Sequence, residues 1–351
     1  MASERHGKIT LNKKSKGVGV LTKTSFFLKS GLTAGLLSLG LAGCGDTNTN
    51  DAEGNGDTVT IGYQTGNTLN VLMETGYLDE RLEEEGYDVE WIEFEVGSAL
   101  MEALASGNID YGNAADGPGI FAQASGHDIV YTGGSVPHEE GVGIMVQEDS
   151  DIDSVSDLEG RSIAATEGGN HFYLAVLALE EAGLSFDDVD FTYVNDASQG
   201  QAALESNEVD ALASWDPFFA AVEENLNVRT LDHDVTDYPN RTFYFATNEF
   251  AEESPEVVQM ILEETNRSDQ WANENPEDVS ELLAGMVGMD ESVMERAIDR
   301  RTFGVENIDE DIIDAQQQQA DVYYEIDLIE DEIDVSEVMP TDAPWTSDNL
   351  E

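Results

Sequence analysis

The sequence has one cysteine, Cys44, among its 351 residues, and no lysine after Lys29. A lone cysteine excludes a disulfide scaffold, and a body without cysteine excludes thiol catalysis and thiolate metal sites there. Basic residues number 15 against 74 acidic ones, so the formal net charge is −59. Such a charge argues against a nucleic-acid binder that depends on phosphate contacts. The length and the 40% share of hydrophobic residues instead suit two domains with their own cores.

The charge is unevenly distributed along the chain. Seven of the 15 basic residues precede Cys44, and the eight that follow it are all arginines, set against 73 acidic residues. A net charge this far from zero destabilises the compact state, and molar salt screens the repulsion because the Debye length falls to about 3 Å. We therefore expect a protein adapted to high salt. An ordinary acidic surface is the alternative, but solubility alone does not require the loss of every lysine.

The amino-terminal part has the organisation of an export signal. A basic leader, 1–29, precedes an apolar run, 32–42, which is shorter than the about 20 residues of a transmembrane helix. The run ends in a Leu-Ala-Gly-Cys sequence that resembles the lipobox of exported lipoproteins, with Cys44 as the lipid attachment point. We expect a signal peptide over 1–43, a flexible polar tether over 44–57, and a protein anchored to the extracytoplasmic face of the membrane. A chance buried cysteine is the alternative.

Beyond the tether, extended segments alternate with helical ones. Ten strands are expected, at 58–63, 88–94, 109–112, 128–132, 142–147, 161–165, 189–194, 209–213, 228–231 and 242–247. Helices follow most of them, and the stretch from 255 to 325 has the pattern of four consecutive helices. This alternation predicts an α/β protein with two parallel-rich sheets that carry helices on their faces. The last segment, 335–351, is expected to be a loosely attached tail.

Three candidate ligand-binding residues lie in the turns after expected strands. Ligands in open α/β sheets bind at the carboxyl ends of strands, and a cleft between two lobes is the usual place. Gln64 can donate and accept hydrogen bonds, which suits an oxyanion, or it is a solvated turn residue. Asp116 and Asp216 each precede a helix with a proline close by, so helix capping is the alternative to ligand binding for both.

Further candidates come from the second half of the body. The turn after the strand at 161–165 contains Gly168, Gly169, Asn170 and His171. Two glycines between a strand and a helix let backbone N–H groups and the positive helix end face an anion, or they are turn chemistry alone. Trp215 is either a core residue or a ligand wall. Arg241 is one of few cations that could balance an anion, with an ion pair to an acidic residue as the alternative.

The sequence carries no catalytic signature. Its histidines are dispersed, and the nucleophile elbow, the lysine-ended phosphate loop and the dinucleotide fingerprint are absent. We therefore expect a binding protein that uses no cofactor or metal, and not an enzyme.

Several stretches, taken in order, resemble one family of binding proteins. They are Ile61-Gly62-Tyr63-Gln64, Val89 to Phe94, Glu102 to Gly112, Asp116-Gly117-Pro118, Asp157 to Gly160, Val209-Asp210-Ala211, Trp215 to Phe218 and Pro239 to Tyr244. Through them the chain from about 58 to 325 resembles the solute-binding lipoproteins of ABC importers in the nitrate, taurine and sulfonate group. Within that group it is most similar to the aliphatic-sulfonate-binding proteins.

The resemblance implies the type II periplasmic-binding-protein fold. In this fold two lobes, each with a mixed, mostly parallel sheet flanked by helices, are hinged by two crossing strands. Lobe 1 would comprise 58–143 and the mainly helical 243–330, lobe 2 would comprise 144–242, and 331–351 would form the tail. Such a protein would act as a monomer that captures one small anion of the sulfonate class. It would deliver the anion to a membrane permease and its ATPase.

The resemblance also implies a set of ligand contacts. They would map onto Gln64, Thr65, the turn at Asp116, the turn from Gly168 to His171, and Trp215 with Asp216. Thr65 stands where relatives usually have lysine, and Asp216 could pair with an amine, which would favour a taurine-like zwitterion. Nitrate, bicarbonate and a thiamine-precursor pyrimidine are the alternative ligands. A small-molecule enzyme on the same fold is a more distant alternative.

Overall fold

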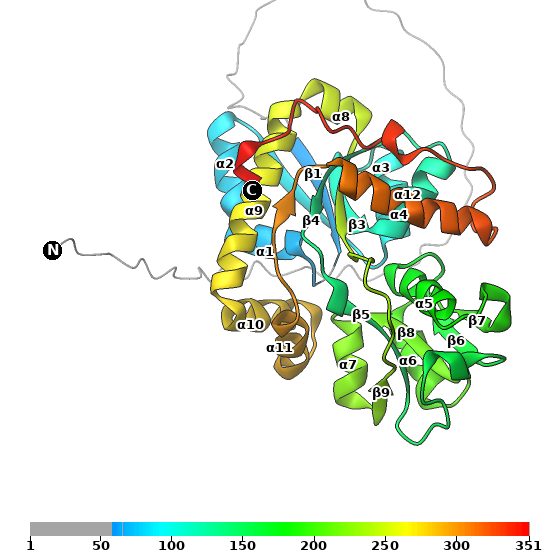
Figure 1. Ribbon diagram of the computed structural model, residues 1–351. Coiled ribbons are helices and arrows are strands. Elements are labelled where there is room, and N and C mark those ends of the chain that lie inside the picture. Colours follow the sequence, from blue (N-terminus) through cyan, green and yellow to red (C-terminus); the bar gives the residue numbers. More distant parts are fainter. Residues whose placement is uncertain (1–57, 65, 351) are drawn as a thin grey trace, which may run out of the picture. The chain divides into compact units, whose positions relative to one another are not determined.

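Two β-sheets with helices on their faces make up the part of the chain that the computed structural model describes, residues 58–64 and 66–350 (Figure 1). The expected signal peptide, Cys44, the tether and Thr65 lie outside these residues. The first sheet, with the order β11-β4-β10-β3-β1-β2, consists of β1 (Thr58–Gln64), β2 (Asp88–Phe94), β3 (Tyr111–Ala115), β4 (Ile129–Ser135), β10 (Thr242–Thr247) and β11 (Val305–Glu306). The second sheet, with the order β7-β6-β8-β5-β9, consists of β5 (Val142–Gln147), β6 (Ser162–Ala165), β7 (Asp190–Tyr193), β8 (Ala211–Trp215) and β9 (Val228–Thr230). We call the first sheet with its helices lobe 1 and the second lobe 2.

Both sheets are mixed. In lobe 1, β1 pairs in parallel with β2 and β3, whereas β10 pairs antiparallel with β3 and β4. In lobe 2, β6 pairs in parallel with β7 and β8, whereas β5 pairs antiparallel with β8 and β9. The chain passes between the lobes twice, from β4 to β5 and from β9 to β10 (Figure 1). This is the two-lobed α/β architecture with two crossing segments that the sequence predicts.

The helices cover the faces of the two sheets. Lobe 1 carries α1 (Thr68–Thr75), α2 (Tyr77–Glu85), α3 (Gly97–Ala105), α4 (Asp116–Ala124), α8 (Asn248–Glu253), α9 (Pro255–Glu274) and α12 (Glu310–Glu325). Lobe 2 carries α5 (Asn170–Glu181), α6 (Ala197–Glu205) and α7 (Phe218–Asn225). Helices α10 (Pro276–Val287) and α11 (Glu291–Asp299) form a hairpin that follows α9 and packs on α7 of lobe 2 (Figure 1). Short 3-10 helices span Glu139–Gly141, Val155–Leu158, Phe186–Asp188, Val335–Glu337 and Asp348–Leu350.

All ten expected strands form, and β3 and β8 begin two residues later than expected. An aspartate directly precedes each of these two strands. Asp110 accepts a hydrogen bond from the backbone N–H of Thr60 on β1 (2.8 Å), and Asp210 accepts one from Ser162 on β6 (2.9 Å). The carboxylates thus take the place of strand carbonyls, and the pairing of β3 and β8 starts after them. The two strands end immediately before Asp116 and Asp216.

Two helices, α1 and α2, meet at Gly76. Gly76 has a φ of 70°, and its N–H donates to the carbonyl of Leu72 (3.3 Å), which closes α1. Helix α2 starts at the next residue and buries Leu78 and Leu82 in the cluster that α9 also lines. A glycine in the left-handed region therefore links two helices here, a use that sequence alone does not distinguish from a stop.

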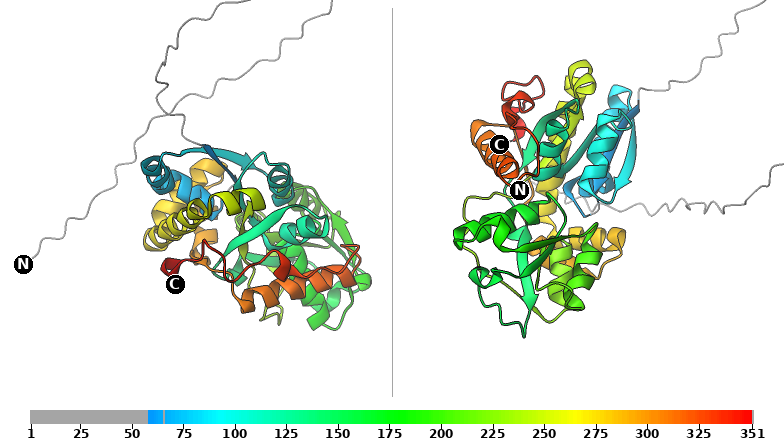
Figure 2. Two further views of the ribbon diagram at one scale, coloured as in Figure 1. Left: turned by 90° about the horizontal axis from the view of Figure 1, so that it is seen from above. Right: turned by 90° about the vertical axis from the view of Figure 1, so that its right-hand side faces the viewer.

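The C-terminal segment packs on lobe 1, so the expectation of a loosely attached tail is wrong. Its buried side chains are Val335, Met339, Trp345 and Leu350. The indole Nε1 of Trp345 donates to the carbonyl of Thr132 (3.0 Å), and the N–H of Tyr131 on β4 donates to the carbonyl of Val338 (2.9 Å). The segment runs across lobe 1 beside α12 (Figure 2). It covers the edge of β4 that the two-residue β11 does not reach, which removes an unpaired sheet edge.

Candidate functional site

A cavity of about 870 Å³ lies between the lobes, at the carboxyl ends of strands from both sheets. Strand β1 ends in Gln64, β3 ends in Ala115, β8 ends in Trp215, and Thr166 follows β6; all four residues line the cavity. A molecule held there contacts both lobes. The position is the one that open α/β sheets offer to ligands.

Most of the candidate residues lie on this cavity. Those that line it are Gln64, Gly168, Gly169, Asn170, His171, Trp215 and Asp216. Asp116 and Arg241 are not on its wall, and Thr65 lies outside the described residues. Most of the candidates thus lie on one cavity, and the partners of their polar side chains decide what each one can do.

His171 and Trp215 form a stacked pair on the cavity wall, with ring centroids 4.5 Å apart and an interplanar angle of 24°. The backbone N–H of Thr166 donates to Nε2 of His171 (3.0 Å), so this nitrogen carries no proton. Nδ1 lies 3.2 Å from Oδ1 of Asn170 and donates to it. Burial lowers the pKa of His171 to about 3. The imidazole is therefore neutral, and it supplies a flat apolar face rather than a positive charge.

The glycine turn offers fewer free N–H groups than its sequence implies. Gly168 has a φ of 64°, and a Cβ there would lie 2.0 Å from the ring of Phe121 in lobe 1, so only glycine fits. The N–H of Thr166 is bound to His171, and the N–H of Gly169 donates to the carbonyl of Thr166 (3.2 Å). The N–H of His171 donates to Oδ1 of Asn170 (3.0 Å). Hydrogen bonds within the turn therefore occupy several of its donors.

Asp216 is paired with an arginine. Its Oδ2 lies 3.0 Å from Nε of Arg300, and its Oδ1 accepts from the N–H of Ala220 (3.1 Å). Burial raises the pKa of Asp216 to about 7, and the charge of Arg300 opposes this rise. The expected pairing of this carboxylate with a ligand amine thus meets a competitor that is already in place.

Asp116 lies beside the cavity, under a set of neutral donors. It accepts hydrogen bonds from the hydroxyl of Tyr238 (2.5 Å), from Nε2 of Gln319 (3.2 Å) and from the N–H of Gly117 (2.7 Å). Burial raises its pKa to about 6, and these three donors oppose the rise. The carboxylate thus takes a backbone N–H at the start of α4, but it makes no contact with the cavity.

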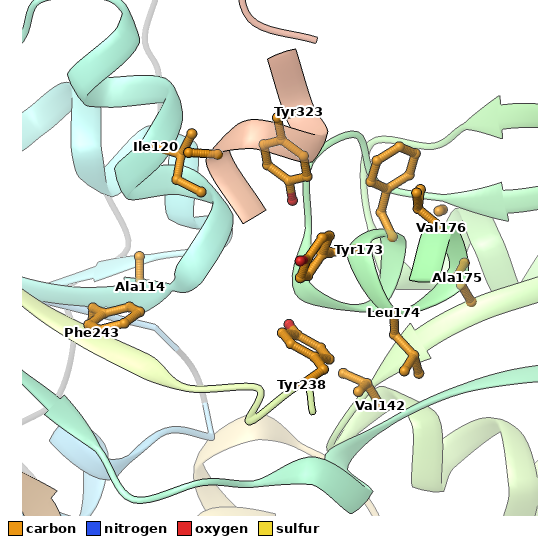
Figure 3. Close-up of a cluster of buried hydrophobic side chains, with 14 of the residues drawn as sticks. Ala114, Ile120, Val142, Tyr173, Leu174, Ala175, Val176, Tyr238, Phe243 and Tyr323 are labelled. Atoms are coloured by element: carbon orange, nitrogen blue, oxygen red, sulfur yellow. The ribbon is translucent and has the colours of Figure 1, made fainter. Parts of the chain in front are cut away.

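Three tyrosines surround this position. Figure 3 shows the hydroxyl groups of Tyr173, Tyr238 and Tyr323 directed toward one region where α4, α5 and α12 meet. The hydroxyl of Tyr323 in lobe 1 donates to the carbonyl of Gly168 in lobe 2 (3.1 Å). The hydroxyl of Tyr238, on the crossing segment before β10, also reaches the carbonyl of Asn170 (3.2 Å). Asp116 therefore belongs to a contact between the lobes.

Arg241 makes the ion pair that was the alternative to ligand binding. Its Nη1 contacts the carbonyl of Ser135 and the carboxylate of Glu306. This arginine holds β10 to β4 and β11, away from the cavity.

The cavity also contains polar residues that the sequence analysis did not single out. Arg301, which follows α11, lines it together with His138 and the first residues of α3, a helix without a side-chain cap. Burial and the nearby charges of Arg301 and Arg300 lower the pKa of His138 to about 3. The only sequence signal for Arg301 was scarcity, since adjacent arginines stand out in a body with eight.

The described residues contain neither a cluster that could bind a metal ion nor a helix that could span a membrane. Among them, no group of three or more histidine, cysteine, aspartate or glutamate side chains is placed to hold a metal ion. None of the described helices is long and apolar enough to cross a membrane.

The fold and the cavity define a two-lobed solute-binding protein of the periplasmic-binding-protein fold. The chain belongs to the NMT1/THI5-like family, whose profile matches residues 74–279. It is 34% identical over 285 residues to a protein of Escherichia coli K12 that is provisionally named as aliphatic sulfonates-binding; the match covers 81% of this chain and 89% of the relative.

Solved structures show the same likeness. The periplasmic aliphatic sulphonate binding protein SsuA from Escherichia coli superimposes with a TM-score of 0.76 at 31% identity, over 84% of this chain and 96% of that one. The alkanesulfonate-binding protein SsuA from Xanthomonas axonopodis pv. citri, bound to MOPS, gives a TM-score of 0.75 at 29% identity, over 80% and 97% of the two chains.

Proposed function

We propose that this protein is the extracytoplasmic solute-binding component of an ABC importer and captures an aliphatic sulfonate or a taurine-like anion. The observation that carries this proposal is the cavity of about 870 Å³ between the lobes, lined from both sheets at the carboxyl ends of their strands. The names of the relatives support the ligand class. The protein acts as a monomer and hands its ligand to a permease driven by an ATPase.

Capture requires no chemical step on the ligand. The stacked His171 and Trp215 offer a flat surface for the aliphatic part, while polar groups of both lobes hold the head group. A ligand that touches both lobes favours the closed arrangement by its contacts to each, and the two crossing segments allow the lobes to move. Binding, closure and release are the whole cycle.

A ligand panel tests the proposal. Unfolding by urea in molar salt, with and without propane-1-sulfonate, taurine or MOPS, should show stabilisation of about 2.7 kcal/mol when the ligand is at 100 times its Kd. Isothermal titration calorimetry on the same panel gives the affinities. Trp215→Ala should weaken binding of propane-1-sulfonate more than binding of the shorter methanesulfonate, because only the longer chain covers the indole.

The alternatives give different results in the same panel. Stabilisation by nitrate, bicarbonate or the thiamine-precursor pyrimidine, with none by any sulfonate, would replace the proposed ligand class. Conversion of a bound ligand, seen by mass spectrometry of the mixture, would make the protein an enzyme.

We also propose that Cys44 carries a lipid anchor that holds the protein at the membrane. The support is the sequence alone, because a small-residue run ends at this one cysteine and a polar tether follows. Mass spectrometry of the mature amino terminus should find the lipid on Cys44. The Cys44→Ser variant should leave the membrane fraction.

Adaptation to high salt is the third part of the proposal. Six of the eight arginines after Cys44 make ion pairs with carboxylates: Arg161, Arg229, Arg241, Arg267, Arg296 and Arg300. These pairs leave most of the 73 acidic residues unbalanced. The free energy of unfolding should therefore rise with KCl from dilute buffer to molar concentration, and a flat response would contradict the proposal.

A further inference from the structure

Arg301 lies on the wall of the cavity and has no acidic partner in an ion pair. Among the described residues its guanidinium makes no ion pair within 4.0 Å, and its one hydrogen bond is a long one from Nη2 to Oδ1 of Asn67 (3.4 Å). The guanidinium carbon lies 4.7 Å from the ring centroid of Phe303, which covers one face of the group. Arg301 also lines the cavity.

Its neighbours on the same segment behave differently. Arg300 pairs with Asp216 at 3.0 Å and with Glu223 at 2.6 Å, and Arg296 pairs with Glu224 at 2.7 Å. Of the described arginines, Arg81 and Arg301 make no such pair, and Arg81 is exposed on α2. The cavity wall carries carboxylates of its own, those of Glu95, Glu102, Glu167, Asp196 and Asp216, and none of them makes an ion pair with Arg301. An arginine that stays unpaired among so many carboxylates is a selective feature.

The surroundings of Arg301 raise the cost of its charge. Desolvation lowers its pKa, and the carboxylate that helps most to hold the charge, Asp269, lies beyond ion-pair distance. Asp269 is itself buried and accepts a hydrogen bond from the hydroxyl of Thr68. A partly buried charge without a close partner is unfavourable, so an anion that enters the cavity relieves this cost.

We propose that Arg301 forms the ion pair with the negative head group of the ligand, which makes it the residue that selects for charge. This rests on the proposed function. A guanidinium presents parallel N–H donors that match two oxygens of a sulfonate, and such charge-assisted pairs are the strong ones in a site shielded from water. Arg301 then balances the charge of the ligand's head group, and the glycine turn and His171 line the site around that group. The ligand completes an ion pair that the protein leaves open.

The test compares a charged ligand with a neutral one of similar shape. Propane-1-sulfonate carries the charge, and methyl propyl sulfone keeps the S=O groups without it. Calorimetry in molar salt gives both affinities for the wild type, Arg301→Gln and Arg301→Lys. Arg301→Gln should lose on the order of 100-fold in affinity for the sulfonate and little for the sulfone, so that the preference between the two collapses. Arg301→Lys should keep the preference and bind the sulfonate about 10-fold more weakly, because it lacks the paired donors.

Arg296→Gln is the matched control. Arg296 belongs to the same helix hairpin but does not line the cavity, so its substitution should leave both affinities unchanged. An equal loss for the sulfonate and the sulfone in Arg301→Gln would give Arg301 a structural role and overturn the inference. Should Arg301→Gln fail to fold by circular dichroism, Arg301→Lys decides, because wild-type affinity in that variant overturns the inference as well. A wild type that binds no sulfonate defeats the proposed function itself, whereas a wild type that binds while Arg301→Gln keeps its preference defeats only the role of Arg301.

Discussion

Two aspartates follow strands of the two lobes and meet different partners. Asp116 after β3 and Asp216 after β8 are both buried, and a proline follows each within two residues. Asp116 accepts hydrogen bonds from a tyrosine hydroxyl, a glutamine amide and a backbone N–H, none of them charged. Asp216 lies against the guanidinium of Arg300. The same local sequence pattern therefore produces one carboxylate held by neutral donors and one held by a cation.

The difference extends to the two places where the lobes are linked beside the crossing segments. The tyrosine flank, formed by Asp116, Tyr173, Tyr238, Gln319 and Tyr323, joins α4 and α12 to α5 (Figure 3). The arginine flank, formed by Asp216, Glu223, Glu224, Arg296 and Arg300, joins the α10 and α11 hairpin to α7. A chain with eight arginines in its body places two of them in one flank and none in the other. Shape and neutral hydrogen bonds hold the first flank, and charge holds the second.

Removal of Arg300 should have the largest effect, because it breaks a buried pair from one side. Its side chain is 15% exposed and that of Asp216 is 5% exposed, so Arg300→Gln leaves a buried carboxylate without its cation. We expect the free energy of unfolding to fall by about 3–5 kcal/mol, measured by urea unfolding in molar salt.

A second substitution in the same flank provides the control. The Arg296 side chain is 46% exposed, and Arg296→Gln should cost no more than about 1 kcal/mol. Adding Asp216→Asn to Arg300→Gln should recover part of the loss, since the double variant removes the buried carboxylate that Arg300→Gln leaves without its cation. Equal losses from Arg300→Gln and Arg296→Gln would mean that burial does not distinguish the two pairs.

The carboxyl group of Asp116 in the tyrosine flank should make the stability of the protein depend on pH. Burial raises the pKa of Asp116 to about 6, above its ordinary value of 3.8, so the folded protein holds this proton more tightly than the unfolded chain. Stability from this group is therefore full below about pH 4 and is lost as the pH rises toward 6. Asp116→Asn removes this titrating carboxyl, and the difference in unfolding free energy between wild type and variant should change by about 2.4 kcal/mol between pH 4 and pH 7.

Asp210 gives the opposite sign under the same substitution. Although burial opposes it, hydrogen bonds from Ser162 and the charge of Arg161 lower the pKa of Asp210. Its contribution to stability is present above the ordinary pKa and is lost as the pH falls through the lower folded value, so the curve for Asp210→Asn should diverge from the wild type in the reverse direction. Difference curves of the same slope for the two variants would contradict the assignment.

Sequence reasoning went furthest where local pattern decides structure. The alternation of strands and helices predicted two sheets with helices on their faces. The ends of β1, β6 and β8 directed attention to Gln64, His171 and Trp215, which line the cavity. Gln64 and Trp215 are the last residues of β1 and β8, and His171 lies at the start of α5, shortly after β6. The carboxyl ends of strands in one lobe converge at one edge of its sheet.

It could not supply the partners that come from distant parts of the chain. Asp216 pairs with Arg300 only because the α10 and α11 hairpin packs on α7. No residue near Asp216 in the sequence predicts that contact. Trp345 lies in the segment that was predicted to be a loose tail, but its indole donates a hydrogen bond to the carbonyl of Thr132 on β4. Arg301 carries no motif, and only its position on the cavity wall and its lack of an ion pair separate it from Arg300.

Gly117 tests whether close contact, rather than charge, holds the tyrosine flank. A Cβ at this position would lie 1.9 Å from the carbonyl oxygen of Gly168 and 3.0 Å from the hydroxyl of Tyr323, so Gly117→Ala must push α4 away from lobe 2. We expect a loss of about 1–3 kcal/mol in unfolding free energy, and a weaker affinity for the ligand because the lobes no longer close fully. The loss should be the same at every salt concentration at which the wild type is folded. Gly285→Ala in α10 is the control, since its Cβ meets nothing within 4 Å and a helical alanine should stabilise by about 0.5–1 kcal/mol. If Gly117→Ala kept wild-type stability and affinity, the contact between α4 and the Gly168 turn would not hold the lobes together, and the arginine flank would be the one that does.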